Sequence, residues 1–208
     1  MNGNINLKEI EKKAWKSYHQ DGLWDIFLGL ILLNFGIAPF LEEITGTTYL
    51  LSYIIILAAA FIIFYGGKKY ITTSRLGKAG FSTERKYKTK KTSIVLTISV
   101  LLGLIIFIVA ATDILPIIGN IHFGAIVFGI NAIIVFSLTA YYLDFNRLYF
   151  YGWFFGASIA LTEISHNYVG YTYDNIIGFG LFAGIMIIIG LAYLVRFIQK
   201  YPNPSEVV

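Results

Sequence analysis

Histidine and carboxylate side chains occur in the second half of the chain in a pattern that could bind a metal ion. Glu163 and His166 are three residues apart, so they would share one face of a helix. His122 begins another apolar segment, and Asp113 and Asp174 lie in neighbouring loops. Imidazole and carboxylate are ligands for zinc or iron, and three ligands with an open position can activate water. The alternative is a set of solvated polar residues at helix ends, since one Glu-x-x-His is not the paired arrangement of a di-iron bundle.

Other polar residues stand within or beside apolar segments. Asp25 lies about a turn inside the first segment, and Asn34 and Asn131 lie near the middle of theirs. A carboxylate at the bilayer centre costs roughly 2.5–3.5 kcal/mol, and less near the end of a span. These three residues could line a route for an ion or a small solute. They could instead be structural, with Asp25 favoured by the helix dipole or paired with Arg147 or Arg196, and the amides bonded between helices.

Two short motifs that resemble catalytic or cofactor sequences are better explained by helix packing. Ser158 stands between Gly156 and Ala160, but a nucleophile turn requires a strand-to-helix bend. Residues 178–183 match a dinucleotide fingerprint without the strand that must precede it. Small residues that recur every fourth position are typical of closely packed helices. The glycines predicted to pack in this way are Gly29, Gly36, Gly152, Gly156, Gly180 and Gly184.

The composition indicates a membrane protein. Hydrophobic residues make up 57% of the chain and charged residues 13%, with a mean hydropathy of +0.69. An ordinary soluble domain has about 25% charged residues, and a soluble fold of this composition would expose aggregation-prone apolar surface. The absence of cysteine excludes disulfides and Cys-ligated zinc. The polar first 22 residues do not predict a cleaved signal peptide.

Six continuous apolar segments of 17 to 23 residues are predicted to cross the membrane as helices. About 20 residues are needed to span about 30 Å of hydrocarbon, and continuous runs favour helices over barrel strands. We therefore predict an all-α polytopic membrane bundle, with an amphipathic interfacial helix in residues 1–22, a transmembrane domain over 23–198 and a tail over 199–208. The spans are predicted at residues 23–41, 49–65, 93–111, 121–142, 148–164 and 176–198.

The distribution of cations predicts the orientation. Residues 66–92, the basic segment, hold nine of the 16 Lys and Arg residues and one acid, Glu84. With both termini cytoplasmic, every Lys and Arg falls on the cytoplasmic side, as the positive-inside rule requires. An odd number of spans would divide the cations between the two sides. The prediction is a multi-pass protein of the cytoplasmic membrane with both termini inside.

The basic segment is predicted to be a cytoplasmic loop that binds anionic lipid headgroups or an acidic partner protein. Each Lys or Arg near an anionic membrane surface contributes on the order of 1 kcal/mol. No recognisable nucleic-acid-binding motif accompanies the charge, so nucleic acid is not an expected partner. The residues expected to make these contacts are Lys68, Lys69, Arg75, Lys78, Arg85, Lys86, Lys88, Lys90 and Lys91.

Two stretches carry a resemblance to known proteins. The sequences DGLWDIFLGL, at residues 21–30, and TSRLGKAGF, at residues 73–81, are similar to an uncharacterised family of small multispanning prokaryotic membrane proteins. The resemblance covers the first span and part of the basic segment, about a quarter of the chain. It implies no activity.

Three functions remain open. The first is a non-enzymatic membrane subunit that self-associates or binds a partner, favoured by the glycine faces, the basic segment and the lack of a catalytic set. The second is a channel or carrier that uses Asp25, Asn34 and Asn131. The spans carry few charges and show no Gly/Pro break at mid-depth, which argues against this function. The third is a membrane metalloenzyme built on His122, Glu163 and His166; apart from that metal, no cofactor is expected.

Overall fold

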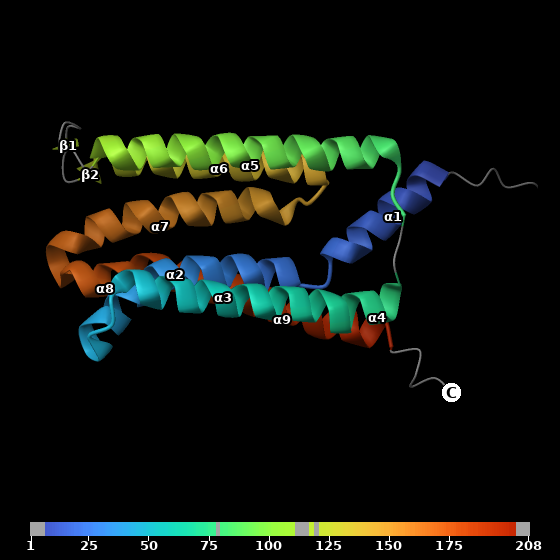
Figure 1. Ribbon diagram of the computed structural model, residues 1–208, viewed down its shortest axis with the longest axis horizontal. Coiled ribbons are helices and arrows are strands. Elements are labelled where there is room, and N and C mark those ends of the chain that lie inside the picture. The colour runs from blue at the N-terminus through green and yellow to red at the C-terminus, as the bar shows by residue number, and fades with distance from the viewer. Residues whose placement is uncertain (1–6, 78–79, 111–116, 119–120, 203–208) are drawn as a thin grey trace, which may run out of the picture.

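The computed structural model describes residues 7–77, 80–110, 117–118 and 121–202, and it is an all-α bundle of long helices lying side by side (Figure 1). Among these residues, one antiparallel pairing joins the two-residue strands β1 (Ile117–Ile118) and β2 (Ile121–His122). The long helices are α2 (Leu23–Thr45), α3 (Tyr49–Gly67), α5 (Thr83–Ala110), α6 (Phe123–Leu143), α7 (Arg147–Val169) and α9 (Leu181–Lys200). The short elements are α1 (Leu7–His19), the π-helical η1 (Lys68–Thr72), α4 (Thr73–Leu76), α8 (Tyr171–Asn175) and the π-helical η2 (Ile176–Gly180).

Among the described residues, five helices are long and apolar enough to cross a membrane, which makes this a multi-span membrane architecture. These helices overlap five of the six predicted spans, although the predicted spans 93–111 and 121–142 extend beyond the helix bounds. The remaining predicted span, residues 148–164, lies in α7, which packs against α6 along the bundle. Helix α7 is less apolar because polar residues such as Glu163 and His166 occupy its last turns. The five helices are Leu23–Thr45, Tyr49–Leu76, Thr83–Ile106, Phe123–Leu143 and Tyr171–Lys200.

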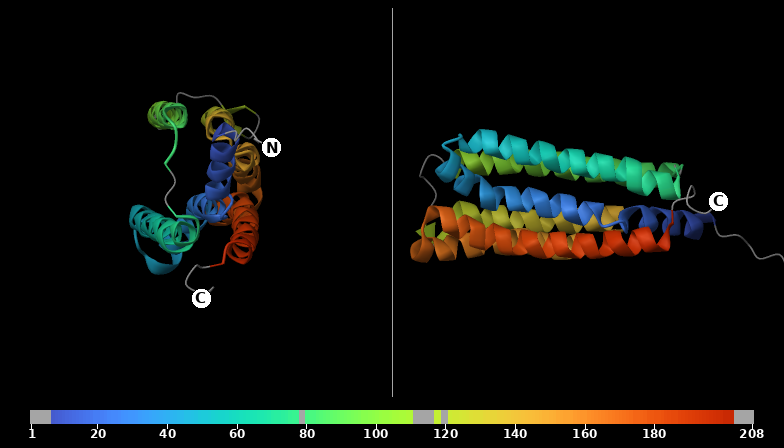
Figure 2. Two further views of the ribbon diagram at one scale, coloured as in Figure 1. Left: turned by 90° about the vertical axis from the view of Figure 1, so that its right-hand side faces the viewer. Right: turned by 90° about the horizontal axis from the view of Figure 1, so that it is seen from below.

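The two ends of the bundle differ in charge. One end, called here the α1 end, holds α1, η1, α4, the first part of α5, the start of α7 and the end of α9 (Figures 1 and 2). The described Lys and Arg residues all belong to these elements. The opposite end, called the α8 end, holds α8, the two strands and the α2–α3 connection, which carries Glu42 and Glu43. The ends of the chain that the structure describes meet at the α1 end, where Ser17 Oγ lies 3.3 Å from the Tyr201 hydroxyl.

The basic segment, predicted as the loop between the second and third spans, is mostly helical. Helix α3 continues through η1 and α4 to Leu76, and α5 already begins at Thr83. Lysine and arginine are good helix formers, so a helix can continue past the end of its apolar residues. Lys68 and Arg85 are buried against the protein, and Lys78 lies outside the described residues. The other six cations of the segment are exposed or half-buried: Lys69, Arg75, Lys86, Lys88, Lys90 and Lys91.

Helix α2 is the centre of the fold. Of its apolar window, 61% is buried, whereas the other candidate spans are at most 22% buried. It packs against α3, α8, η2 and α9. One core cluster joins α2 to α6, α7 and α9 around Leu32, Tyr151 and Met186, and a second joins α2 to α3 around Phe27 and Phe64. Burial of α2 explains why changes on this helix should have the largest structural effects.

Glycines let α2 approach α9 and its preceding turns closely. A Cβ added to Gly22 would lie 2.1 Å from the carbonyl oxygen of Gly190, a distance that no side chain tolerates. Gly22 also has a φ of +75°, which favours glycine. Farther along α2, a Cβ on Gly29 would lie 2.7 Å from Ile187 Cγ1, and one on Gly36 would lie 3.1 Å from a backbone oxygen of α8.

Helices α6 and α7 also approach each other at glycines. A Cβ added to Gly152 would lie 2.8 Å from Phe136 Cβ, and one added to Gly156 would lie 3.0 Å from Ile133 Cδ1. Both glycines of α7 that were predicted to pack closely therefore do so against α6. This contact runs antiparallel, since the two helices follow each other through a short turn at the α1 end.

The glycines of the last span behave differently from the prediction. A Cβ on Gly184 would meet nothing within 4 Å, so its assignment to a packing face is wrong. A Cβ on Gly180 would meet only Ile176 at 3.8 Å, although the backbone of Gly180 touches Gly36. The close contacts are instead made by Gly178 and Gly190, because the π-helical turn η2 changes the helical register that a regular α-helix would give.

We predict that Gly190→Ala destabilises the protein, by about 1–3 kcal/mol, because the new methyl group would be forced against Ile26 N at 2.8 Å and Gly22 O at 2.9 Å. Gly184→Ala is the matched control on the same helix, and its stability should be unchanged or higher by up to about 1 kcal/mol through helix propensity. Reversible unfolding in detergent micelles measures both. Equal losses for the two variants would contradict the proposed α2–α9 contact.

Candidate functional site

A buried acid–base pair joins the start of α2 to η1. The Asp21 carboxylate is fully buried, and its Oδ2 accepts hydrogen bonds from Lys68 Nζ at 2.6 Å and from Thr72 Oγ1 at 2.5 Å. Its Oδ1 accepts a hydrogen bond from the backbone N–H of Leu23 at 3.1 Å, which satisfies one of the free donors at the start of α2. Asp21 therefore both caps α2 and holds the extension of α3 against it.

A second buried pair joins α2 to α7. Arg147 Nη2 lies 2.9 Å from Asp25 Oδ2, and the Tyr151 hydroxyl donates a hydrogen bond to Asp25 Oδ1. Asp25 and Tyr151 are both almost completely buried. Arg147 is one of the two arginines predicted as a partner for Asp25, whereas Arg196 is exposed. One oxygen of the Asp25 carboxylate thus accepts a hydrogen bond, and the other is ion-paired with Arg147 without a hydrogen bond.

The cations of these two pairs also hold α1 on the end of the bundle. Lys68 Nζ donates to the Tyr18 carbonyl oxygen at 2.7 Å, and Arg147 Nη2 donates to the His19 carbonyl oxygen at 2.8 Å. The last carbonyls of a helix have no partner within it and carry a partial negative charge, so cations stabilise them. One set of charges therefore joins α1, α2, η1 and α7.

Trp15 anchors the middle of α1 to the loop that connects α6 and α7. Its indole Nε1 donates to the Leu143 carbonyl oxygen at 2.6 Å, and the Arg85 guanidinium lies 5.0 Å from the centre of its ring. Arg85 also pairs with Asp144, whose carboxylate lies 2.5 Å from Nη1. Asp144 ends α6 in the left-handed conformation, with φ of 52°. The start of α5 is thereby fixed to both α1 and the α6–α7 turn.

His19 ends α1 in a buried position. The pKa of His19 is lowered to about 4, mainly because the ring is buried, and the charges of Lys68 and Arg147 also lower it. The hydrogen bond to the Trp15 backbone acts in the opposite direction and raises the pKa. The acceptor of that bond is a carbonyl oxygen, 3.0 Å from Nδ1, so Nδ1 carries the proton in the neutral ring. His19 also lines a cavity of about 190 Å³, together with Lys16 and Arg147.

The two asparagines predicted as pathway residues make separate contacts between helices. Asn34 Nδ2 donates to the Tyr53 carbonyl oxygen of α3 at 3.0 Å. Asn131 Nδ2 donates to Ser99 Oγ of α5 at 3.1 Å. The structure does not bring these amides together with Asp25, because they join different pairs of helices. Both contacts fit the structural alternative that the sequence left open.

The predicted metal ligands form two pairs at the α8 end. His122 Nδ1 lies 2.9 Å from Glu163 Oε2, and His166 Nδ1 lies 2.6 Å from Asp174 Oδ2. All four side chains line one cavity of about 330 Å³. Within the described ranges, no three His, Asp or Glu residues form a group that could hold a metal ion. Asp113 lies outside those ranges.

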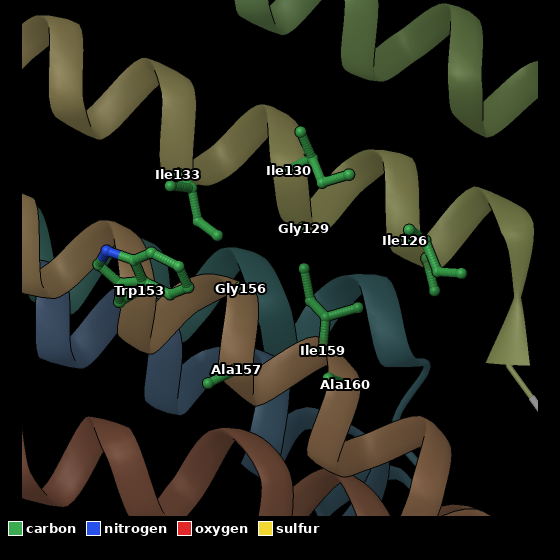
Figure 3. A pocket seen from close by; sticks show the side chains of 10 residues that line it. Ile126, Gly129, Ile130, Ile133, Trp153, Gly156, Ala157, Ile159 and Ala160 are labelled. Atoms are coloured by element: carbon green, nitrogen blue, oxygen red, sulfur yellow. The ribbon is translucent and has the colours of Figure 1, made fainter.

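An apolar groove of about 280 Å³ lies between α6 and α7 (Figure 3). It is lined by small residues of both helices, by an indole ring and by isoleucines, of which Ile133 and Ile159 point into the space between the helices. Such a surface allows the close approach of another apolar helix. The small residues are Ala125, Gly129, Gly156, Ala157 and Ala160, and the larger ones are Ile126, Ile130, Ile133, Trp153 and Ile159.

Comparison of the chain with protein-family models, with curated proteins and with solved structures found no match. The resemblance of residues 21–30 and 73–81 to a family of multispanning proteins therefore stays a prediction. The structure supports a multi-span membrane protein.

Sequence reasoning missed Asp21 and Tyr151 and misassigned Lys68. The spacing of these residues in the sequence could have indicated that they act together. Asp21 and Asp25 are four residues apart, as are Arg147 and Tyr151, so each pair can share one side of its segment. The pairing itself could not be read, since Asp21 and Lys68 are 47 residues apart.

We predict that Arg147→Met destabilises the protein by about 3–5 kcal/mol, because the buried Asp25 carboxylate is left without its cation. The double variant Asp25→Leu/Arg147→Met should be less destabilised than Arg147→Met alone, since no charge is then buried without a partner. Unfolding of both variants and of Asp25→Leu in micelles completes the double-mutant cycle. Strictly additive effects would show that the two side chains do not interact.

We also predict that α1 detaches as the solution is acidified. The folded-state pKa of His19, about 4, lies below its unfolded value of about 6.5, so the unfolded form binds the proton first. The contribution of the neutral, buried His19 ring to the docking of α1 is complete above pH about 6.5. It decreases as the pH falls toward 4. Amide hydrogen exchange of α1 measures this opening. In His19→Gln the exchange of α1 should depend less on pH over this range, and an unchanged dependence would argue against His19 as its source.

Proposed function

We propose that this chain is a non-enzymatic subunit of the cytoplasmic membrane that crosses the bilayer six times, with both termini inside. Helix α7 would supply the sixth crossing, since its 23 residues exceed the roughly 20 that a span requires. Its position alongside α6 supports this assignment. The positive-inside rule favours a cytoplasmic location for the α1 end, to which the described cations belong.

The observation that carries the proposal is that the buried charges are used within the protein. Asp25 Oδ1 accepts a hydrogen bond from Tyr151, and its Oδ2 is ion-paired with Arg147 without a hydrogen bond. Both oxygens of Asp21 accept hydrogen bonds, from η1 and from the start of α2. A carrier would need ligand groups that are free to exchange a protein partner for an ion. The two pairs instead hold α1 as a fixed cover over one end of the bundle, which favours a structural or binding role.

The association face of such a subunit is best placed at the groove between α6 and α7 (Figure 3). Apolar side chains gain little from contacting each other in lipid, so membrane helices associate through close packing at small residues. The lining of the groove includes several such residues on two adjacent helices. We propose that the groove receives a helix of a second copy of this chain, and a different membrane protein is the alternative occupant.

A carrier is the second candidate function, and one observation favours it. Cavities at both ends of the bundle adjoin buried acid–base groups, near Arg147 at the α1 end and near Asp174 at the α8 end. These two cavities share no lining residue. Under this alternative, Asp25→Asn would alter ion flux in proteoliposomes and leave self-association intact.

We predict that Ala160→Phe weakens self-association, because the phenyl ring would fill the groove that receives the partner helix. Overpacking of this kind costs about 1–3 kcal/mol, which corresponds to a loss of affinity of about tenfold. Ala160 is exposed at the groove, so the fold itself should tolerate the change. Ile62→Phe is the matched control, since Ile62 is 72% exposed on α3. Subunit counting by single-molecule photobleaching in liposomes gives the result. A monomeric wild type, or identical subunit numbers for both variants, would refute self-association at this face.

A further inference from the structure

Helix α5 is the least enclosed of the candidate spans. Only 6% of its apolar window is buried, and it packs mainly against α6. The view from the α1 end in Figure 2 shows α5 set apart from α3. A cavity of about 400 Å³ lies beside α5, and α2, α6, α7 and η2 also line it. We infer that this cavity holds an acyl chain of an anionic phospholipid, whose headgroup contacts lysines at the start of α5.

The lining of this cavity, called here the α5 cavity, suits a hydrocarbon chain. Of the residues that line it, Ser99 and Asn131 alone have polar side chains, and the Asn131 amide donates its hydrogen bond to Ser99. Phe35 of α2 and Phe179 of η2 lie among its other lining residues. An apolar chain can fill such a space, whereas a polar solute would find few hydrogen-bond partners there.

Lysines of α5 lie beside the line that leads from the α5 cavity to the α1 end. A helix repeats its sides at intervals of 7 and 11 residues, so three residues of the first turns share the side of Leu96 and Gly103, which line the cavity. Lys86 and Lys88 flank that side. The three residues are Arg85, Thr89 and Thr92.

The distance between these lysines and the α5 cavity matches the depth of a lipid leaflet. At 1.5 Å per residue, Lys88 lies about 12 Å along the helix from Leu96 and about 22 Å from Gly103. One leaflet contributes about half of the 30 Å of hydrocarbon, which is about 15 Å. A phospholipid whose headgroup lies at Lys88 can therefore place its acyl chain in the α5 cavity.

The charge at the start of α5 favours an anionic headgroup. Arg85 is paired with Asp144, but Lys86 has no ion pair among the described residues. Lys88 lies 3.8 Å from Glu84, and both side chains are exposed, so this pair contributes little. Clusters of cations beside the cytoplasmic end of a membrane helix attract anionic lipids. A phosphodiester between the two lysines would balance charge that the protein leaves open.

A lipid fits this site better than a helix of a second copy does. Close helix contact in a membrane uses rows of small residues, whereas α5 lines the cavity with Leu96 and Val100 and with a single glycine, Gly103. A second copy with the same orientation would also bring its own positive end beside Lys86 and Lys88. The inference is independent of the self-association proposed at the groove between α6 and α7.

The test compares two double variants that remove the same charge from different sides of α5. Lys86→Gln/Lys88→Gln removes the lysines beside the cavity side, and Lys90→Gln/Lys91→Gln removes two that lie farther around the helix. Native mass spectrometry in neutral detergent measures the affinity of each protein for phosphatidylglycerol and for phosphatidylcholine. The first variant should lose about thirtyfold in affinity for phosphatidylglycerol, or five- to sixfold for each lysine, and should keep its affinity for phosphatidylcholine. The second variant should keep both.

A further variant, Ala132→Phe, tests the seat of the acyl chain. Ala132 lines the α5 cavity, so the phenyl ring would occupy it and lower the affinity for both lipids by about tenfold. Ala59→Phe is the matched control, because Ala59 is exposed on α3 and does not line this cavity. The lysine variants change side chains near the surface, so they decide the question of the headgroup even where Ala132→Phe does not fold.

Two results would overturn the proposal. Equal losses of phosphatidylglycerol affinity in the two lysine variants would show only diffuse attraction to the positive end. A lower subunit number for Ala132→Phe in liposomes, with unchanged lipid affinities, would assign the α5 cavity to a helix of a second copy. A monomeric wild type with the predicted lipid affinities would refute self-association and leave the lipid site standing.

Discussion

A charge beside a low-dielectric interior must have a partner, and the rest of this structure depends on how that constraint is met at the α1 end. Asp21 with Lys68, and Asp25 with Arg147, bring together segments from across the chain. Since a buried charge without a partner is far less favourable than a paired one, the arrangement of these segments is strongly coupled. Asp25 lies in α2 and Asp21 lies just before it, and α2 is also the most buried of the candidate spans.

The same charges explain why α1 is part of the bundle. An amphipathic helix of 13 residues is marginal by itself in water, so its contacts must stabilise it. The cations on its last carbonyls and the Trp15 contact to the α6–α7 turn provide this stabilisation. Docking of α1 also closes one wall of the cavity that holds His19 and Arg147. A cover held by buried charges is consistent with the structural role proposed above.

Much of the fold could be predicted from the sequence, because a simple rule applies: a helix needs about 20 consecutive apolar residues to cross the lipid bilayer. The predicted start of the second span, at Tyr49, is the first residue of α3, and the predicted amphipathic segment contains α1. The rule says nothing about where a helix ends in water, so the helical basic segment was missed. It also could not reveal that Lys68 is buried, because that depends on a carboxylate distant in the sequence. The failure at Gly184 has a local cause, the π-helical turn before α9.

The proposed six-crossing arrangement requires α7 to cross the membrane and the α1 end to be cytoplasmic. The chain contains no cysteine, so single cysteines can be placed at the two exposed ends of α7 without a background signal. A membrane-impermeant maleimide applied to intact cells should label Tyr168→Cys, and it should label Asn146→Cys only after the membrane is permeabilised. Labelling of both positions in intact cells, or of neither, would contradict the six-crossing arrangement, and the reverse pattern would contradict its orientation.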